Sequence, residues 1–143
     1  IPWPFRTRCR MSVALAADVE NLSILGSAAL NGFGNALSNV MTGNSGNNIL
    51  SGNGGNDRLT GGAGSDNFVF RSGADIVTDF VNDVDTIQID DVVWGGGGRS
   101  VAQVLAYAQV IGGNVVFDFG NGNTMTINGL TDISALQNAL AIV

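Results

Sequence analysis

Glycine and acidic side chains recur at a fixed nine-residue spacing in the middle of the chain. Three units run head to tail from Gly43 to Val69: GNSGNNILS, GNGGNDRLT and GGAGSDNFV. In each unit positions one and four are glycine, and position six is Asn48, Asp57 or Asp66. Because glycine has no side chain and tolerates positive φ, several carbonyl groups of such a loop can turn towards one point. Carboxylate and carbonyl oxygens in a flexible cage are the ligands that calcium takes, whereas magnesium demands a tighter octahedron.

The last three residues of each unit are predicted to form a short β-strand. Position eight is apolar in these units and in the eroded units on either side: Met41, Leu50, Leu59, Phe68 and Val77. Successive side chains of a strand point to opposite faces, so position eight is expected to face a core. A strand of three residues is not stable alone and needs neighbours stacked about 4.8 Å away. The pattern therefore predicts a solenoid with two units, or eighteen residues, per coil and one strand in each of two facing sheets.

Loops eighteen residues apart are expected to lie on the same side of this solenoid. Gly43–Asn48 then lies against Gly61–Asp66, and Asp57 stands about one strand spacing from Asp75. Two carboxylates at that separation repel by about 3 kcal/mol at an effective dielectric constant of about 20. A cation between the loops would turn this repulsion into a bridge, so we expect metal binding and folding to be coupled.

The composition restricts the classes of function. The chain has 143 residues, of which 45% are hydrophobic, so it can form one domain with a modest core. Its net charge of −6 disfavours nucleic acids and anionic membranes as partners and favours cations. The chain contains no histidine, which removes the commonest catalytic base. No apolar run approaches the roughly 18 residues that a membrane span needs, so we expect no stable membrane insertion.

The sequence predicts four regions. Residues 1–12 contain both prolines and three of the six arginines, and are expected to be a linker or an expression remnant. Residues 13–42 are predicted to be degenerate N-terminal coils, since terminal repeats are usually atypical. Residues 43–78 are the nonapeptide solenoid, and residues 79–143 a C-terminal cap.

Within the cap, the patterns predict a strand, two helical stretches and a hairpin. Ile87 and Ile89 alternate as in a strand, and Ser100 is a candidate N-cap for a helix over residues 100–109. Residues 114–119 and 124–128 flank a glycine–asparagine turn and predict a β-hairpin. A last helical stretch is expected to start at Thr131 or Asp132 and to run to the end.

The central units resemble the nonapeptide G-G-x-G-x-D-x-U-x of the repeats-in-toxin (RTX) family. Gly61–Val69 matches at every defined position, Gly52–Thr60 departs once and Gly43–Ser51 departs twice. Residues 75–89 are similar to the segment after the repeats in serralysin-like C-terminal domains. Residues 114–143 resemble the C-terminal region of proteins exported by type I secretion, where an uncleaved signal lies at the end.

The resemblance implies an all-β fold: a parallel β-roll, that is a right-handed two-sheet β-solenoid, with a C-terminal β-rich cap and one or two short helices. It implies about two to four Ca²⁺ ions between same-side loops, bound by carbonyls of positions one to four and side chains of positions five and six. The implied ligand positions are Gly43, Ser45, Asn47, Gly52, Gly54, Asn56, Asp57, Gly61, Gly62, Ala63, Gly64, Asp66, Gly73, Asp75, Asp79 and Asp85. Asn48 is expected to weaken its site because it lacks a charge, and Asp79 and Asp85 to close the last site.

The resemblance further implies a non-catalytic calcium-binding module that folds on extracellular Ca²⁺ and serves as the folding and secretion region of a bacterial type I secreted protein. Its partners would be calcium ions and the type I secretion machinery, and a larger parent could be a protease, lipase or epimerase. The alternative is a carbohydrate- or surface-binding β-roll, of adhesin or ice-binding type, with structural calcium. Thr42, Thr60 and Thr78 recur every eighteen residues as an ice-binding ladder would, but Val40, Arg58 and Ile76 interrupt a regular lattice. The oligomeric state is left open.

Overall fold

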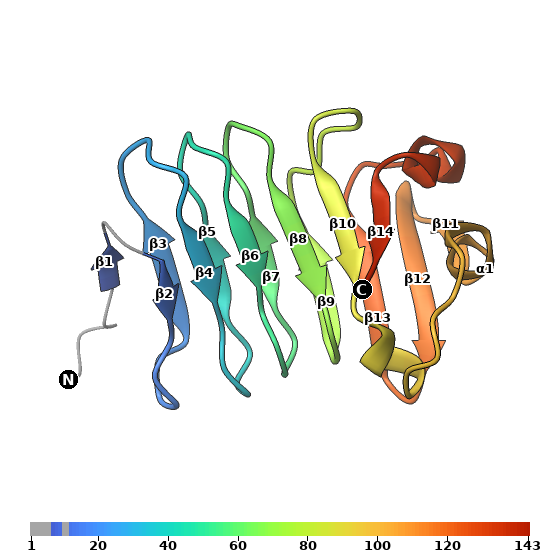
Figure 1. The fold of residues 1–143 in the computed structure, drawn as a ribbon, viewed down its shortest axis with the longest axis horizontal. Coiled ribbons are helices and arrows are strands. Elements are labelled where there is room, and N and C mark those ends of the chain that lie inside the picture. Colours follow the sequence, from blue (N-terminus) through green and yellow to red (C-terminus); the bar gives the residue numbers. More distant parts are fainter. Residues whose placement is uncertain (1–6, 10–11) are drawn as a thin grey trace.

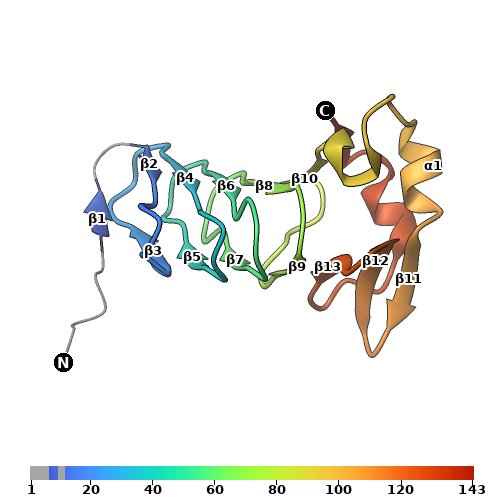
Figure 2. The same ribbon diagram turned by 90° about the horizontal axis from the view of Figure 1, so that it is seen from below.

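The computed structural model describes residues 7–9 and 12–143, in which β-strands wind into a parallel solenoid of about four turns with only 11% helix. Two sheets face each other, and along the solenoid successive strands alternate between them (Figures 1 and 2). This arrangement confirms the predicted all-β solenoid. The predicted linker at residues 1–12 lies largely outside the described residues, of which Thr7–Cys9 form strand β1 beside β3.

The larger sheet has eight strands in the order β1-β3-β5-β7-β9-β13-β12-β11. They are β1 (Thr7–Cys9), β3 (Asn21–Ile24), β5 (Val40–Thr42), β7 (Arg58–Thr60), β9 (Ala74–Val77), β11 (Ala108–Ile111), β12 (Asn114–Gly120) and β13 (Asn123–Ile127). The smaller sheet has six strands in the order β14-β10-β8-β6-β4-β2. They are β2 (Val13–Ala14), β4 (Asn31–Phe33), β6 (Ile49–Ser51), β8 (Asn67–Phe70), β10 (Thr86–Ile89) and β14 (Leu140–Ile142). The helical segments are η1 (Asp91–Trp94), α1 (Val101–Leu105) and η2 (Ile133–Gln137).

Position eight of the repeat units forms the core between the sheets, as predicted. Met41 pairs with Leu59 and Leu59 with Val77 in the larger sheet, while Leu50 pairs with Phe68 in the smaller one. All five side chains are 0% exposed. Burying one such side chain stabilises the fold by roughly 1.5–3 kcal/mol. The nine-residue period is therefore maintained by the core as well as by the loops.

Two rows of loops connect the sheets, one along each edge of the solenoid. The upper loops, as drawn in Figure 1, run from the larger to the smaller sheet and comprise residues 25–30, 43–48, 61–66 and 78–85. The lower loops run back and comprise residues 15–20, 34–39, 52–57 and 71–73. Within the repeats, loops eighteen residues apart thus lie on one edge, next to each other, because their flanking strands are paired.

The C-terminal cap continues both sheets. The predicted strand at Ile87 and Ile89 is β10, and the predicted hairpin is formed by the antiparallel strands β12 and β13. β13 pairs in parallel with β9, and β14 pairs in parallel with β10. None of the helices in the described part of the chain has the length and apolar character that a bilayer crossing requires.

The prediction of a helix over residues 100–109 is correct in its first half and wrong in its second. α1 starts after the predicted N-cap Ser100, whose hydroxyl accepts a hydrogen bond from the backbone N–H of Gln103, but it ends at Leu105. Residues 108–111 form β11 instead, antiparallel to β12. Gly112 and Gly113, at φ of 59° and 79°, make the turn that brings β11 and β12 together. Pairing with a neighbouring strand thus overrides the local helical spacing.

The last helical stretch is also shorter than expected. Asp132 is its N-cap, as predicted, and its carboxylate accepts a hydrogen bond from the backbone N–H of Ser134. The helix η2 ends at Gln137, after which the chain forms β14. The physical reason is β10, whose outer edge offers backbone hydrogen bonds to Leu140–Ile142.

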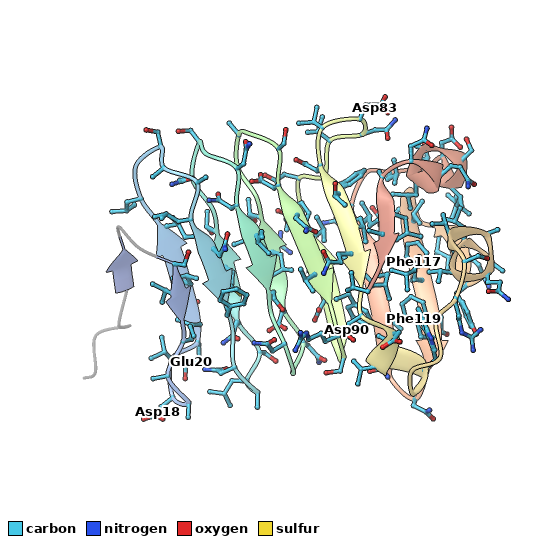
Figure 3. The ribbon with its side chains drawn as sticks, in the orientation of Figure 1. Asp18, Glu20, Asp83, Asp90, Phe117 and Phe119 are labelled. Atoms are coloured by element: carbon cyan, nitrogen blue, oxygen red, sulfur yellow. The ribbon has the colours of Figure 1, made fainter. Side chains whose placement is uncertain are left out.

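Aromatic side chains pack together in the cap. The ring centroid of Phe119, labelled on β12 in Figure 3, lies 5.6 Å from that of Phe70, 5.4 Å from that of Tyr107 and 6.1 Å from that of Trp94. The guanidinium of Arg99 lies 5.1 Å from the centroid of Trp94 and donates a 2.7 Å hydrogen bond to the Tyr107 hydroxyl. Arg99 therefore joins the loop before α1 to the aromatic cluster.

Replacing Arg99 with methionine is expected to lower the free energy of unfolding by about 1 kcal/mol, because a cation–π contact and a hydrogen bond are lost while the aliphatic stem is kept. Urea denaturation in calcium-containing buffer measures the change. Arg71→Met is the matched control, since Arg71 pairs with Asp90 at 3.1 Å from a side chain that is 53% exposed. Such exposed pairs contribute little. Equal losses in the two variants would contradict the stacking role of Arg99.

Candidate metal sites

The position-six side chains of the repeats form a column along each edge of the solenoid. Asn48 and Asp66 lie on the upper edge, and Asn39, Asp57 and Asp75 on the lower edge. Each of the five side chains is no more than 2% exposed. Buried acids in register are unusual, because a carboxylate loses its hydration when it enters the interior. The predicted stacking of Asp57 and Asp75 on one edge is therefore confirmed.

A ladder of backbone hydrogen bonds fixes one oxygen of each carboxylate. On the lower edge, Oδ1 of Asp57 accepts from the N–H of Asn39 at 2.8 Å, and Oδ1 of Asp75 accepts from the N–H of Asp57 at 3.0 Å. On the upper edge, Oδ1 of Asp66 accepts from the N–H of Asn48 at 2.8 Å. Each carboxylate thus reaches back to position six of the coil before it.

The second oxygen of the Asp57 and Asp66 carboxylates lies beside the first glycine of its own loop, Gly52 or Gly61, where an added Cβ would overlap it. Oδ2 of Asp57, Oδ2 of Asp66 and Oδ2 of Asp75 are buried and have no hydrogen-bond partner among the described residues. A buried acceptor without a partner costs roughly 1–3 kcal/mol, and more when it is charged. These three atoms are the strongest structural sign of an additional positively charged partner at the edges of the solenoid.

The same burial shifts the ionisation of the three acids. It raises the pKa of Asp57, Asp66 and Asp75 above the ordinary value of 3.8. The pKa of Asp75 rises to about 8, first because of burial and then because of the charge of Asp57, although the hydrogen bond from the Asp57 N–H opposes the shift. Near neutral pH Asp75 therefore requires either a proton or a bound cation.

Backbone carbonyls of one loop approach the next loop on the same edge where glycine leaves room. A Cβ on Gly73 would overlap the carbonyl oxygen of Gly55, and one on Gly62 would overlap that of Asn44. Gly62 and Gly73 also have positive φ, at 92° and 91°. The close approach of carbonyl oxygens and the positive φ together explain why these positions need glycine.

The donor set fits calcium better than a transition metal. Within the described residues, no three or more His, Cys, Asp or Glu side chains converge as an all-side-chain metal site. The solenoid edges instead carry buried carboxylates, together with backbone carbonyl oxygens that approach the neighbouring loop closely. Hard oxygen ligands in a flexible arrangement are characteristic of Ca²⁺, which takes six to eight of them.

Comparison with known families agrees with this geometry. The family model described as RTX calcium-binding nonapeptide repeat matches residues 33–77, in four copies. Residues 33–77 are RTX calcium-binding repeats. No curated protein is detectably similar to the chain. The match begins before Gly43 and ends at Val77, so it includes the eroded units on both sides of the three central ones.

The upper RTX loop that follows the repeats differs from the others. Both oxygens of Asp79 accept backbone hydrogen bonds, from Gly61 and Gly62 at 2.8 Å each. Asp85 accepts from the N–H of Asp66 at 2.9 Å and from that of Val81 at 2.8 Å. These oxygens retain lone pairs, so the ligand role of Asp79 and Asp85 stays a prediction. Their charges raise the pKa of Asp66, after the larger effect of burial.

Figure 3 shows which acids lie away from the RTX gaps. Asp83 lies at the outer tip of the loop between β9 and β10 and points away from the solenoid. Asp18 and Glu20 lie on the opposite edge, in the first lower loop. Of the acids near the repeats, Asp83 is therefore a suitable control for the buried set.

The remaining predicted ligand positions are brought to the same edges. Position one is buried at Gly43, Gly52 and Gly61. The amide oxygen of Asn47 accepts from the N–H of Ser65 at 2.8 Å, and that of Asn56 accepts from the N–H of Ala74 at 3.0 Å. Position three comprises Ser45, Gly54 and Ala63, and position four includes Gly64. Their roles as ligands stay predictions.

Two features of the RTX region are absent from the sequence-based prediction. The lower loop before Asp75 comprises only residues 71–73, because β8 extends to Phe70 and β9 begins at Ala74, which places Asp75 at the start of a strand. The turn between β12 and β13 then takes the place of the next lower loop: the side-chain oxygen of Asn123 accepts from the N–H of Gly73 at 2.9 Å. No repeat links residues 73 and 123, so the sequence carries no signal for this contact.

Proposed function

We propose that this calcium-binding β-roll is a folding switch, loose where calcium is scarce and folded where calcium is plentiful. The observation that carries the proposal is the set of three buried carboxylate oxygens, on Asp57, Asp66 and Asp75, that have no partner among the described residues. The carboxylates belong to stacked loops of successive coils, so their repulsion acts against the contacts that build the solenoid. A bound Ca²⁺ would link the coils through these carboxylates and the carbonyls beside them, and binding would add directly to folding stability.

The switch suits a protein that is exported before it folds. Extracellular calcium modules can have dissociation constants of about 10⁻⁴–10⁻³ M, so they fill outside the cell and empty where calcium is scarce. We propose that the chain is the C-terminal folding and secretion region of a bacterial type I secreted protein. The resemblance of residues 114–143 to type I secreted C-termini supports this assignment, as does the cap that follows the repeats. About two to four ions are proposed per chain.

We propose a binding role and no catalysis for this region. Each buried acid at the solenoid edges accepts a backbone hydrogen bond on one oxygen and leaves the other without a partner among the described residues, which suits the binding of a cation. A catalytic site would need a nucleophile or a base within hydrogen-bond reach of its partner. An activity of a larger parent protein would then belong to other parts of that protein.

A calcium titration followed by circular dichroism tests the proposed switch. The calcium-free chain is expected to lose most of its β-signal, and calcium is expected to restore it with a sigmoidal dependence. Asp66→Asn is expected to move the midpoint to at least about tenfold higher calcium, since a charged ligand is replaced by a neutral one. Asp83→Asn is the control and should leave the midpoint unchanged. A full β-spectrum in calcium-stripped buffer that calcium does not alter would exclude the proposal.

A second candidate function is surface or carbohydrate binding, and one groove favours it. A groove of about 240 Å³ lies on the outer face of the smaller sheet, lined by Phe33, Ile49, Ser51, Asn53, Asn67, Val69, Arg71 and Gln88. The aromatic ring and the amides are of the type that contacts sugars. Calorimetry with acidic and neutral oligosaccharides, on the chain and on Phe33→Ala, tests this function. The ice-binding version is less favoured, because Thr60 and Thr78 hydrogen-bond to each other at 2.6 Å.

A further inference from the structure

We propose that asparagine amides replace calcium at the N-terminal end of the solenoid, so that the ions are confined to the later coils. The inference rests on the proposed calcium switch and refines it by assigning which gaps between same-edge loops take a metal. Two gaps are called the amide-closed gaps: the lower gap between residues 15–20 and 34–39, and the upper gap between residues 25–30 and 43–48. Three later gaps, called the carboxylate gaps, lie between residues 34–39 and 52–57, 43–48 and 61–66, and 52–57 and 71–73.

In the lower amide-closed gap, two side chains hold the loops together directly. The side-chain nitrogen of Asn35 donates to the carbonyls of Ala16 at 2.6 Å and Val19 at 2.8 Å. The side-chain nitrogen of Asn39 donates to Val19 at 3.2 Å and to Glu20 at 3.4 Å. Donors from one loop thus bind carbonyl oxygens of the preceding loop. A calcium ion would otherwise provide this link between the two loops.

The upper amide-closed gap repeats the arrangement nine residues later. The side-chain nitrogen of Asn44 donates to the carbonyl of Ala28 at 2.9 Å, with Leu25 at 3.4 Å. The side-chain nitrogen of Asn48 donates to the carbonyl of Leu30 at 2.8 Å. The same two positions of the repeat, two and six, are therefore used in both gaps. In the sequence alone, Asn44 and Asn48 are only departures from the RTX pattern.

The carboxylate gaps have the opposite chemistry. Position six there is Asp57, Asp66 or Asp75, and an ionised carboxylate accepts but cannot donate. Each leaves Oδ2 buried and unpartnered among the described residues, whereas Asn39 and Asn48 are as deeply buried and each side-chain nitrogen of the two donates at least one hydrogen bond. The change from amide to carboxylate at position six therefore marks where this side chain stops donating to carbonyls of the preceding loop and a cation is required.

The first carboxylate gap is intermediate between the two types. The side-chain nitrogen of Asn53, at position two, donates to the carbonyl of Gly34 at 2.8 Å, as in the amide-closed gaps. Oδ2 of Asp57, at position six, is nevertheless without a partner within the described residues. In the next upper loop, position two is Gly62, which has no side chain to donate. The amides thus disappear along the chain in the order in which the unpartnered carboxylates appear.

Counting bound ions by native mass spectrometry at saturating calcium tests the assignment on the full chain. The double variant Asn44→Ala/Asn48→Ala, which removes the donors of the upper amide-closed gap, is expected to keep the wild-type number of ions. The matched change in a carboxylate gap, Asp66→Ala, is expected to bind at least one ion fewer. A lower ion count in the asparagine variant would overturn the inference, because it would make those side chains ligands. If wild type binds no calcium at all, the proposed switch itself fails.

A second measurement on the unaltered chain covers the case in which the asparagine variant does not fold. Mn²⁺ substituted for Ca²⁺ broadens backbone amide NMR signals most strongly nearest the ion. Amides of residues 52–57 and 61–66 are expected to broaden most strongly, and those of residues 16–20 and 25–30 more weakly, because successive loops are about 4.8 Å apart and these loops lie further from the ions. Broadening of residues 16–20 or 25–30 as strong as that of residues 52–57 and 61–66 would overturn the inference and leave the switch intact.

Discussion

Replacing Gly73 with alanine is expected to destabilise the calcium-loaded protein by more than about 4 kcal/mol, which is exceptional for a single substitution. Gly73 has φ of 91°, a conformation that costs an L-residue roughly 1–2 kcal/mol. A Cβ there would also overlap the carbonyl oxygen of Gly55, which is backbone and cannot rotate away. Relief requires the two lower loops to separate beside the hydrogen bond from the N–H of Asp57 to the carboxylate of Asp75.

Urea denaturation of Gly73→Ala in saturating calcium measures this loss, and a calcium titration should show weaker binding in parallel. Gly129→Ala is the matched control, because Gly129 also has positive φ, at 74°, yet a Cβ added there would meet no described atom within 4 Å. That variant should lose only about 1 kcal/mol, the cost of the backbone conformation alone. A Gly73→Ala variant no less stable than the control would refute the close-approach argument.

Without calcium, the protein is expected to be much more stable at pH 5 than at pH 8. A carboxyl group whose folded pKa is raised binds its proton more tightly when folded, so its stabilisation is complete at low pH and is lost as the pH rises through the folded pKa. For Asp75 the loss runs from the ordinary value of 3.8 to about 8, and Asp57 and Asp66 shift in the same direction. Thermal unfolding in calcium-stripped buffer at several pH values measures the effect.

Calcium should reverse this trend, because an ion at the unpartnered oxygens takes over the role of the proton. In saturating calcium, stability is therefore expected to rise between pH 5 and pH 8. Asp75→Asn keeps the shape of the side chain and removes its charge, so its calcium-free stability should vary less with pH. A calcium-free midpoint that stays constant between pH 5 and pH 8 would contradict the ionisation argument.

The part of the fold that follows a strict repeat could be predicted from the sequence. One period places Met41, Leu59 and Val77 in a single core column, and the same period places Asp57 beside Asp75. Both the core column and the stacked aspartates follow from the eighteen-residue length of one coil. The three unpartnered oxygens then follow, because aspartate in a buried column has more acceptor capacity than one backbone N–H can use.

The rest could not be predicted because it depends on departures from the period. The upper loop at residues 78–85 is longer than those at 43–48 and 61–66, so the N–H of Asp66 donates to Asp85 nineteen residues later, and Asp79 is free to accept from Gly61 and Gly62. In the cap, Ala108 has the spacing of a helix but pairs with Phe117 of β12. The hydrogen bonds by which asparagine amides close the first gaps could not be predicted, because the sequence does not show which carbonyls lie opposite them.

The attachment of the cap sets an order of assembly. β13 and β14 obtain parallel partners from β9 and β10, and β14 begins about fifty residues after β10 ends. Pairing of strands so distant in sequence costs chain entropy before the stabilising contacts can form. Such pairs therefore form slowly unless the strand that they dock onto is already in place. The coils must therefore be wound before the C-terminal strands can dock. Stopped-flow measurements should show the cap aromatics becoming ordered last, after the solenoid has closed.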